Sequence, residues 1–97
     1  MYAQIPNEIN ELVHLTWLSM PMNFMFEGTI PSQLFDLVQL RYLDLSQNGL
    51  GGVVHWHISF LEELEGLYLH ENNFVGTVPL LPEYIKTQEQ GSCWLCK

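Results

Sequence analysis

The stretch LVQLRYLDLSQNGLGG, residues 37–52, returns as LEELEGLYLHENNFVG, residues 61–76. The repeated positions, from Leu37 to Gly52 in the first copy, reappear 24 positions later, from Leu61 to Gly76. A fixed period of this length is the signature of a solenoid, in which each repeat forms one coil. Since one coil cannot bury its leucines alone, neighbouring coils must stack and cover each other. We therefore predict a stack of short coils.

The same spacing continues upstream, so we predict three coils. The period from Asn23 to Asn48 is 25 residues, and we expect the extra residue to form a bulge near Phe26 and Glu27. The slot that holds proline in three copies holds His55 in the other. The predicted division is an array over residues 1–81, with coils at about 5–30, 31–54 and 55–79, and a degenerate tail over 82–97.

Each unit contains one predicted strand. Leu43 and Leu45 alternate with Tyr42 and Asp44, which is typical of a half-buried strand with a period of two. Outside the strand, leucines recur every three residues at Leu34, Leu37 and Leu40, a spacing that suits a 3₁₀ or irregular helix. We expect corresponding strands at 17–20 and 66–69, and assign Gly49, Gly51 and Gly52 to the turn of the repeat.

One asparagine follows each predicted strand. Its side-chain amide can bond the backbone of neighbouring coils, so the sequence predicts an asparagine ladder. Replacing such a buried asparagine with alanine would leave unpaired groups and cost roughly 1 to 3 kcal/mol. The ladder residues are Asn23, Asn48 and Asn72.

These residues resemble the plant-type leucine-rich repeat, whose pattern is LxxLxxLxLxxNxLxGxIPxxLxxL. The resemblance covers roughly residues 5–79, and residues 40–48 fit every fixed position. It implies an α/β fold, a right-handed leucine-rich-repeat solenoid with a parallel sheet along its inner face. In this family the inner face typically binds peptides, small ligands or other proteins. Its members include ectodomains of receptor-like kinases, receptor-like proteins and inhibitors of cell-wall-degrading enzymes.

The alternation of the strands places a set of side chains on the inner face, and Ser46 is expected to point outward with them. Aromatic and arginine side chains dominate interface energetics, which favours a binding surface. The alternative is that the aromatics only cover leucine edges. Arg41 and Glu65 occupy equivalent places and are expected to form an exposed ion pair. The candidate binding residues are Trp17, Ser19, Arg41, Tyr42, Asp44, Tyr68, His70 and Glu71.

Two motifs invite a chemical interpretation. Cys93-Trp94-Leu95-Cys96 could be redox-active, half of a zinc site, or remnant cap cysteines, but a structural zinc needs four ligands and no histidine has ligand spacing to it. His55-Trp56-His57 is expected to face solvent on an outer loop. We predict no catalytic residue, no metal and no cofactor.

The amino-acid composition limits the classes of molecule that this chain is expected to bind. The 97 residues carry a net charge of −8, which argues against nucleic acid and anionic membrane surfaces. No apolar run approaches a membrane span, and residues 1–6 lack the features of a signal peptide. We expect a fragment, a truncated gene product or a short paralogue. The resemblance implies a secreted or cell-surface setting for a full-length relative, while this chain leaves its compartment open.

The leading functional prediction is therefore non-catalytic recognition of a protein or peptide on the inner face. The alternative is a structural remnant of a longer array, without a partner of its own. A thiol enzyme built on the two cysteines is a third, disfavoured hypothesis. Because no capping segment is evident, we also expect self-association through the ends of the solenoid.

Overall fold

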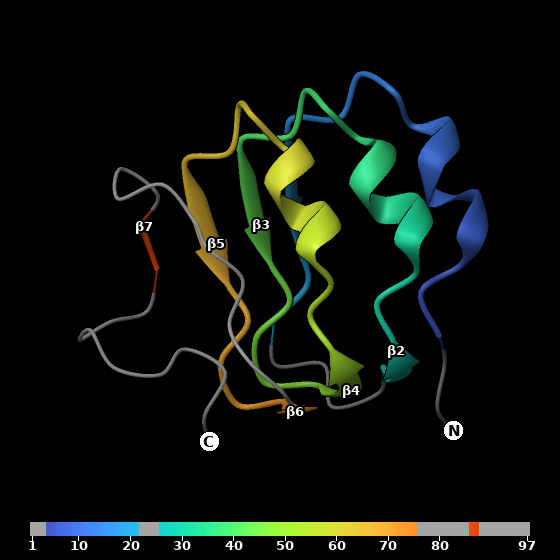
Figure 1. The fold of residues 1–97 in the computed structure, drawn as a ribbon, viewed down its shortest axis with the longest axis vertical. Coiled ribbons are helices and arrows are strands. Elements are labelled where there is room, and N and C mark those ends of the chain that lie inside the picture. The colour runs from blue at the N-terminus through green and yellow to red at the C-terminus, as the bar shows by residue number, and fades with distance from the viewer. Residues whose placement is uncertain (1–3, 22–25, 76–85, 88–97) are drawn as a thin grey trace.

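The computed structural model describes residues 4–21, 26–75 and 86–87, and these form a short solenoid (Figure 1). Each coil combines an inner strand, a second short strand and a 3₁₀ helix. Within the described ranges every helix is of the 3₁₀ type, so the helical part of the predicted α/β class consists of short tight turns. None of these helices has the length and apolar character needed to cross a membrane.

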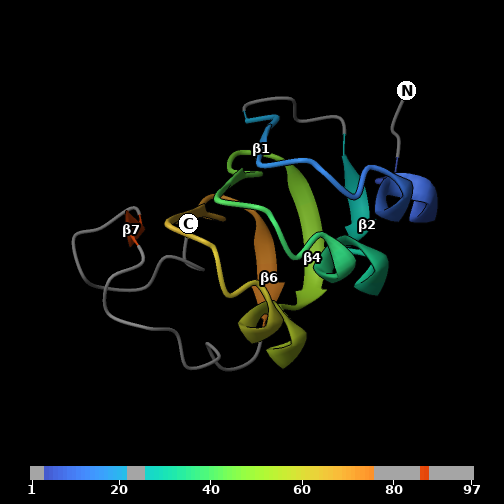
Figure 2. The same cartoon turned by 90° about the horizontal axis from the view of Figure 1, so that it is seen from above.

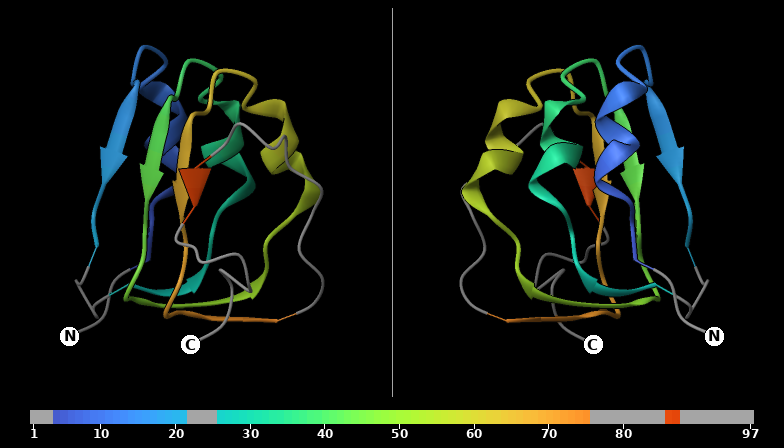
Figure 3. Two further views of the ribbon diagram at one scale, coloured as in Figure 1. Left: turned by 90° about the vertical axis from the view of Figure 1, so that its left-hand side faces the viewer. Right: turned by 90° about the vertical axis from the view of Figure 1, so that its right-hand side faces the viewer.

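The inner sheet is parallel and has the strand order β1-β3-β5-β7. Its strands are β1 (Trp17–Ser19), β3 (Tyr42–Asp44), β5 (Gly66–Tyr68) and β7 (Lys86–Thr87). Trp17 pairs with Tyr42 and Tyr42 with Gly66, so the register follows the sequence repeat of 25 and then 24 residues. The strands stand side by side along one wall of the molecule (Figure 3).

Strand β7 was not anticipated, because residues 82–97 were assigned to a degenerate tail. Its two residues pair with Gly66 and Leu67 of β5. The predicted boundary between array and tail stays a prediction, since 76–85 and 88–97 lie outside the described residues.

The opposite wall consists of η1 (Asn7–Glu11), η2 (Ser32–Asp36) and η3 (Trp56–Phe60), which agrees with the predicted 3₁₀ segments. The residue before each helix is extended, with φ of −73° at Pro6, −68° at Pro31 and −72° at His55. Proline fixes φ near this value. His55 therefore adopts a proline-like backbone in the slot where the other described coils have proline.

A second parallel sheet links the two walls, and the sequence interpretation missed it. It consists of β2 (Glu27–Thr29), β4 (Gly49–Val53) and β6 (Asn73–Val75), in the order β2-β4-β6. These strands lie at the bottom of Figure 1 and are seen from above in Figure 2. Assigning Gly49, Gly51 and Gly52 to a turn was thus wrong, since all three belong to β4. Only Gly52 needs glycine's conformational freedom there, with φ of 77°.

Within the described residues 26–29, the bulge expected near Phe26 and Glu27 is not found. Glu27 pairs with Gly49, and the ladder then continues regularly from β2 to β4. Because Gly51 pairs in the same way with Asn73, Phe26 occupies the place that Leu50 holds in the next coil. Phe26 packs against the core accordingly. The extra residue therefore precedes Phe26.

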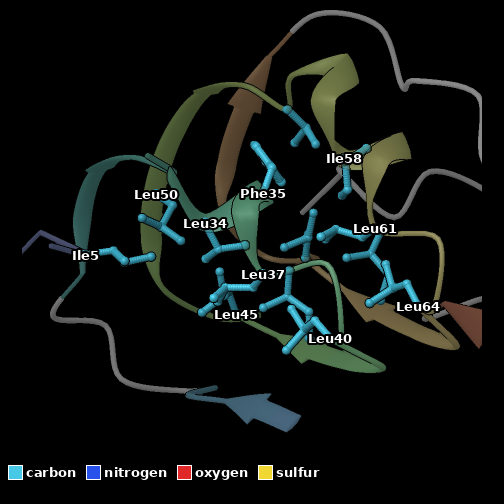
Figure 4. Close-up of a cluster of buried hydrophobic side chains, with 14 of the residues drawn as sticks. Ile5, Leu34, Phe35, Leu37, Leu40, Leu45, Leu50, Ile58, Leu61 and Leu64 are labelled. Carbon is cyan, nitrogen blue, oxygen red and sulfur yellow. The ribbon is translucent and has the colours of Figure 1, made fainter. Parts of the chain in front are cut away.

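The core is a continuous column of leucines between the two walls (Figure 4). Leu43 of β3 and Leu67 of β5 are fully buried, whereas the equivalent Leu18 of β1 is only half-buried. Leu12 of the same first coil is 52% exposed, whereas Leu37 and Leu61 at the equivalent places are buried. The first coil is thus covered on one side only within the described structure, as expected for a stack of coils.

Candidate functional site

The inner sheet carries a row of three aromatic side chains, one per coil. The rings of Trp17 and Tyr42 stack with centroids 3.9 Å apart and planes within 6°. The ring of Tyr68 follows, tilted, with its centroid 5.4 Å from that of Tyr42. Trp17 is 62% exposed and the two tyrosines are half-buried. Such amphipathic rings suit recognition, because they offer contact area at small entropic cost.

Gly66 makes this row possible. It pairs with Tyr42 in the sheet register, so a side chain there would stand beside the Tyr42 ring. A Cβ at Gly66 would lie 3.1 Å from Cδ2 of Tyr42 and 3.3 Å from Cε2 of Tyr68. The tyrosine rings therefore lean toward each other over a glycine, which is buried beneath them.

The environment of Tyr42 favours its neutral phenol. Partial burial raises the pKa of Tyr42, and the charge of Asp44 and the neighbouring Tyr68 raise it further. Removing a phenol from water disfavours its charged form, and nearby negative charge acts in the same direction. The Tyr42 hydroxyl thus keeps its hydrogen-bond donor throughout the physiological range.

Asp44 binds back to its own strand end. Its Oδ1 accepts hydrogen bonds from the backbone N–H of Ser46 at 3.0 Å and from the Ser46 hydroxyl at 2.7 Å. Ser46 is only 3% exposed, so its expected outward position was wrong. The second bond accounts for this, because it satisfies the buried hydroxyl. Ser19 is exposed and lies opposite Asp44 in the register.

Beyond the strand ends, a polar ridge continues the same face. Nε2 of Gln47 donates a hydrogen bond of 2.9 Å to Oε1 of Glu71 in the next coil. Both residues have positive φ, 57° and 58°, and occupy equivalent places. His70, beside Glu71, is half-buried, and its backbone carbonyl accepts from the N–H of Gln47.

Arg41 and Glu65 lie at the edge of this face. The predicted ion pair is present at the outer limit of contact, with Nη1 of Arg41 4.0 Å from Oε2 of Glu65. Both side chains are largely exposed to solvent. Such pairs contribute roughly 0 to 1 kcal/mol, so this pair matches neighbouring coils and adds little stability.

Asn48 and Asn72 bond across coils under this surface. Nδ2 of Asn72 donates to the carbonyl of Leu45 in the preceding coil at 2.9 Å, and its Oδ1 accepts from the N–H of Leu50 at 3.0 Å. Nδ2 of Asn48 donates to the carbonyl of Met20 at 3.0 Å. The third predicted member, Asn23, lies outside the described residues.

The two histidines of the outer wall stack on each other. The ring centroids of His55 and His57 are 4.1 Å apart, and Nδ1 of His55 accepts from the N–H of His57. His55 is exposed, as expected, while His57 is half-buried. Among the described residues there is no group of three or more metal-ligating side chains. Cys93 and Cys96 lie outside the described part of the chain.

Together, the leucine column, the stacked parallel strands and the buried asparagines define a leucine-rich-repeat solenoid. A family model described as Leucine Rich Repeat matches residues 39–61. Receptor-like protein 41 of Arabidopsis thaliana is 42% identical over 71 residues, covering 73% of this chain and 8% of the relative. The fold is that of a leucine-rich-repeat solenoid, and over most of its length the chain is similar to plant receptor-like proteins.

Solved structures of plant receptors have a similar fold. The plant peptide hormone receptor RGFR1 in complex with RGF2 matches with a TM-score of 0.75 and 29% identity, over 78% of this chain and 12% of the receptor chain. The PEPR1–AtPEP1 structure matches with a TM-score of 0.74 and 36% identity, over 78% of this chain and 11% of that chain. The sequence thus spans only 8% of Receptor-like protein 41 and 11 to 12% of these two matched chains.

Proposed function

We propose that this chain recognises a peptide or an extended protein segment on its inner face, without catalysis. The observation that carries the proposal is the continuous row of Trp17, Tyr42 and Tyr68, which crosses three coils on the sheet side of the solenoid. Interfaces are dominated by a few such aromatic anchors. Similarity to a receptor whose structure was solved with a peptide hormone supports the same function.

Polar groups beside the aromatic row would fix the orientation of a bound segment. Asp44 lies two residues beyond Tyr42 on the same strand, while His70 and Glu71 follow β5. A bound segment would place apolar side chains on the aromatic row and polar groups on this border. Ser19 and Arg41 complete the proposed surface, and the solenoid supplies a rigid frame that reduces the entropic cost of binding.

A display library of short peptides, selected on the whole chain, tests the proposal. Selected peptides should bind the wild type, and Tyr42→Ala or Tyr68→Ala should weaken them at least about tenfold, as expected for anchor residues. Trp56→Ala is the matched control, because it removes an exposed aromatic from the outer wall. Equal affinity for the wild type and both tyrosine variants would refute binding at this face.

The exposed first coil favours a second candidate, in which these repeats mainly extend a longer array. Leu12 is exposed there, unlike Leu37 and Leu61 at the equivalent places, and Leu18 is less covered than its counterparts. We propose that another repeat, or a second copy of this chain, covers this end. Analytical ultracentrifugation across a concentration series should reveal assembly, and Leu12→Glu should reduce it. A monomer at every concentration would contradict self-association.

A further inference from the structure

The outer wall holds a groove that the proposed function does not use. Two hollows, of about 740 and 400 Å³, adjoin each other there, since Phe35, Asp36 and Phe60 line both. Glu62 and Glu63 line the upper end of the groove. It lies along η2 and η3, which run side by side on the wall opposite the inner sheet (Figure 1). We call these five residues the outer trough.

One side of the outer trough is aromatic. Phe35 is buried beneath it, whereas the side chain of Phe60 is 50% exposed. Trp56 supports Phe60 edge-on, with ring centroids 5.3 Å apart and planes at 86°. Half of the Phe60 side chain is therefore open to a ligand, while Trp56 and His57 pack against the rest of its ring.

The other groups of the trough are acidic. Asp36, Glu62 and Glu63 are exposed, and Asp36 has only a long contact of 3.4 Å, from Nδ2 of Asn10. Two basic residues also line the groove, Arg41 and His57, and the one ion pair among the described residues joins Arg41 to Glu65 at 4.0 Å. Asp36, Glu62 and Glu63 thus form no ion pair within the described residues, and the net charge of the whole 97-residue chain is −8.

We propose that the outer trough binds a basic polypeptide segment through an arginine side chain. A planar guanidinium can stack on the ring of Phe60 while its N–H groups donate to Asp36 or Glu63, and lysine cannot combine both contacts in this way. The negative charge of the trough is complementary to such a segment and speeds its approach. This surface is separate from the inner face, so either can be right without the other.

Fluorescence polarisation with a labelled Arg-Gly-Arg-Gly-Arg amide, on the whole chain, tests the proposal. Asp36→Asn or Glu63→Gln should each weaken binding by up to about fivefold, the usual range for exposed charge pairs. Phe60→Ala should weaken it by about two- to fivefold. A Glu-Gly-Glu-Gly-Glu amide should not bind.

Matched control variants distinguish binding at the outer trough from general electrostatic attraction between the acidic chain and the basic probe. Glu27→Gln removes the same charge from β2, outside the trough, and Val53→Ala removes an exposed apolar side chain from β4. Both should bind the arginine probe as the wild type does, and circular dichroism should show that every variant is folded. The proposal is overturned if Glu27→Gln weakens binding as much as Asp36→Asn, or if the probe does not bind.

Discussion

Gly66 lies opposite Tyr42 in the inner sheet, and its missing Cβ is what allows the Tyr42 and Tyr68 rings to lean together. The aromatic row therefore depends on a residue with no side chain. A glycine weakens a strand, because it has no side chain to pack and loses more entropy on folding. Its presence at this position is explained by the space that the two rings need.

Gly66→Ala should accordingly change the arrangement of the aromatic row, Trp17, Tyr42 and Tyr68, more than it changes the fold. The new methyl group would approach Tyr42 and Tyr68 within 3.1 and 3.3 Å, so the rings must swing toward solvent. We expect a loss of about 1 kcal/mol in the free energy of unfolding, at the low end for overpacking. The near-ultraviolet circular dichroism of the aromatic side chains should change. In the control Gly51→Ala, a Cβ meets only ordinary contacts, the nearest 3.6 Å from the Asn73 carbonyl oxygen. Its spectrum should match that of the wild type.

Asn72→Ala should destabilise the chain strongly for a single polar residue. It would leave the N–H of Leu50 and the carbonyl of Leu69 without their side-chain partner, while the carbonyl of Leu45 would keep only its bond from Nδ2 of Asn48. Unpaired buried groups cost about 1 to 3 kcal/mol, and urea unfolding should show a loss in this range. Asn73→Ala, at the exposed neighbouring position, should change stability by no more than about 0.5 kcal/mol. Similar losses in the two variants would contradict the hydrogen-bond account.

His55→Pro should stabilise the chain. His55 already has φ of −72° and ψ of 151°, and the equivalent positions before η1 and η2 are prolines. Proline restricts the unfolded chain and should add about 0.5 kcal/mol at a compatible site. His55→Ala is the matched control, since it also removes the imidazole that accepts from the N–H of His57. Thermal unfolding should rank proline above alanine, and a proline variant less stable than alanine would refute the account.

Stability should fall at alkaline pH through Tyr42. Its pKa is raised in the folded chain, above the ordinary value of 10.0, so the folded state holds this proton more tightly than the unfolded state does. The resulting stabilisation is complete below the unfolded pKa and is lost as the pH rises through the folded pKa. Asp44→Asn should shift the phenolate absorbance titration of the chain to lower pH, because the charge of Asp44 opposes ionisation. The control Asp36→Asn, on the outer wall, should leave the titration unchanged, and identical curves for both variants would disprove this role of Asp44.

The repeat itself predicted the inner sheet, the 3₁₀ segments and most of the core, because leucine spacing records directly which side chains face inward. The second sheet escaped prediction because Gly49, Gly51 and Gly52 carry no alternation, and its ladder depends on backbone groups alone. Ser46 was misplaced for a related reason, since its bonds to Asp44 override the strand alternation.

The candidate site was only partly visible in the sequence. Equivalent positions placed Trp17 beside Tyr42, and the structure adds the geometry of their stack. The contact between Tyr42 and Tyr68 is diagonal across the sheet, and it depends on the space above Gly66. The outer trough combines residues of different coils, such as Asp36 and Phe60, which only the stacking brings together.

The uneven cover of the coils also has a kinetic consequence. Leucines of the second coil, such as Leu43 and Leu50, have a neighbouring coil on each side, whereas Leu18 of the first has one. Local opening requires less free energy where fewer apolar contacts must be broken. Backbone amides should therefore exchange with deuterium fastest around β1 and slowest around β3. The molecule would then open from its first coil inward, and the Trp17 end of the aromatic row would be its most adaptable part.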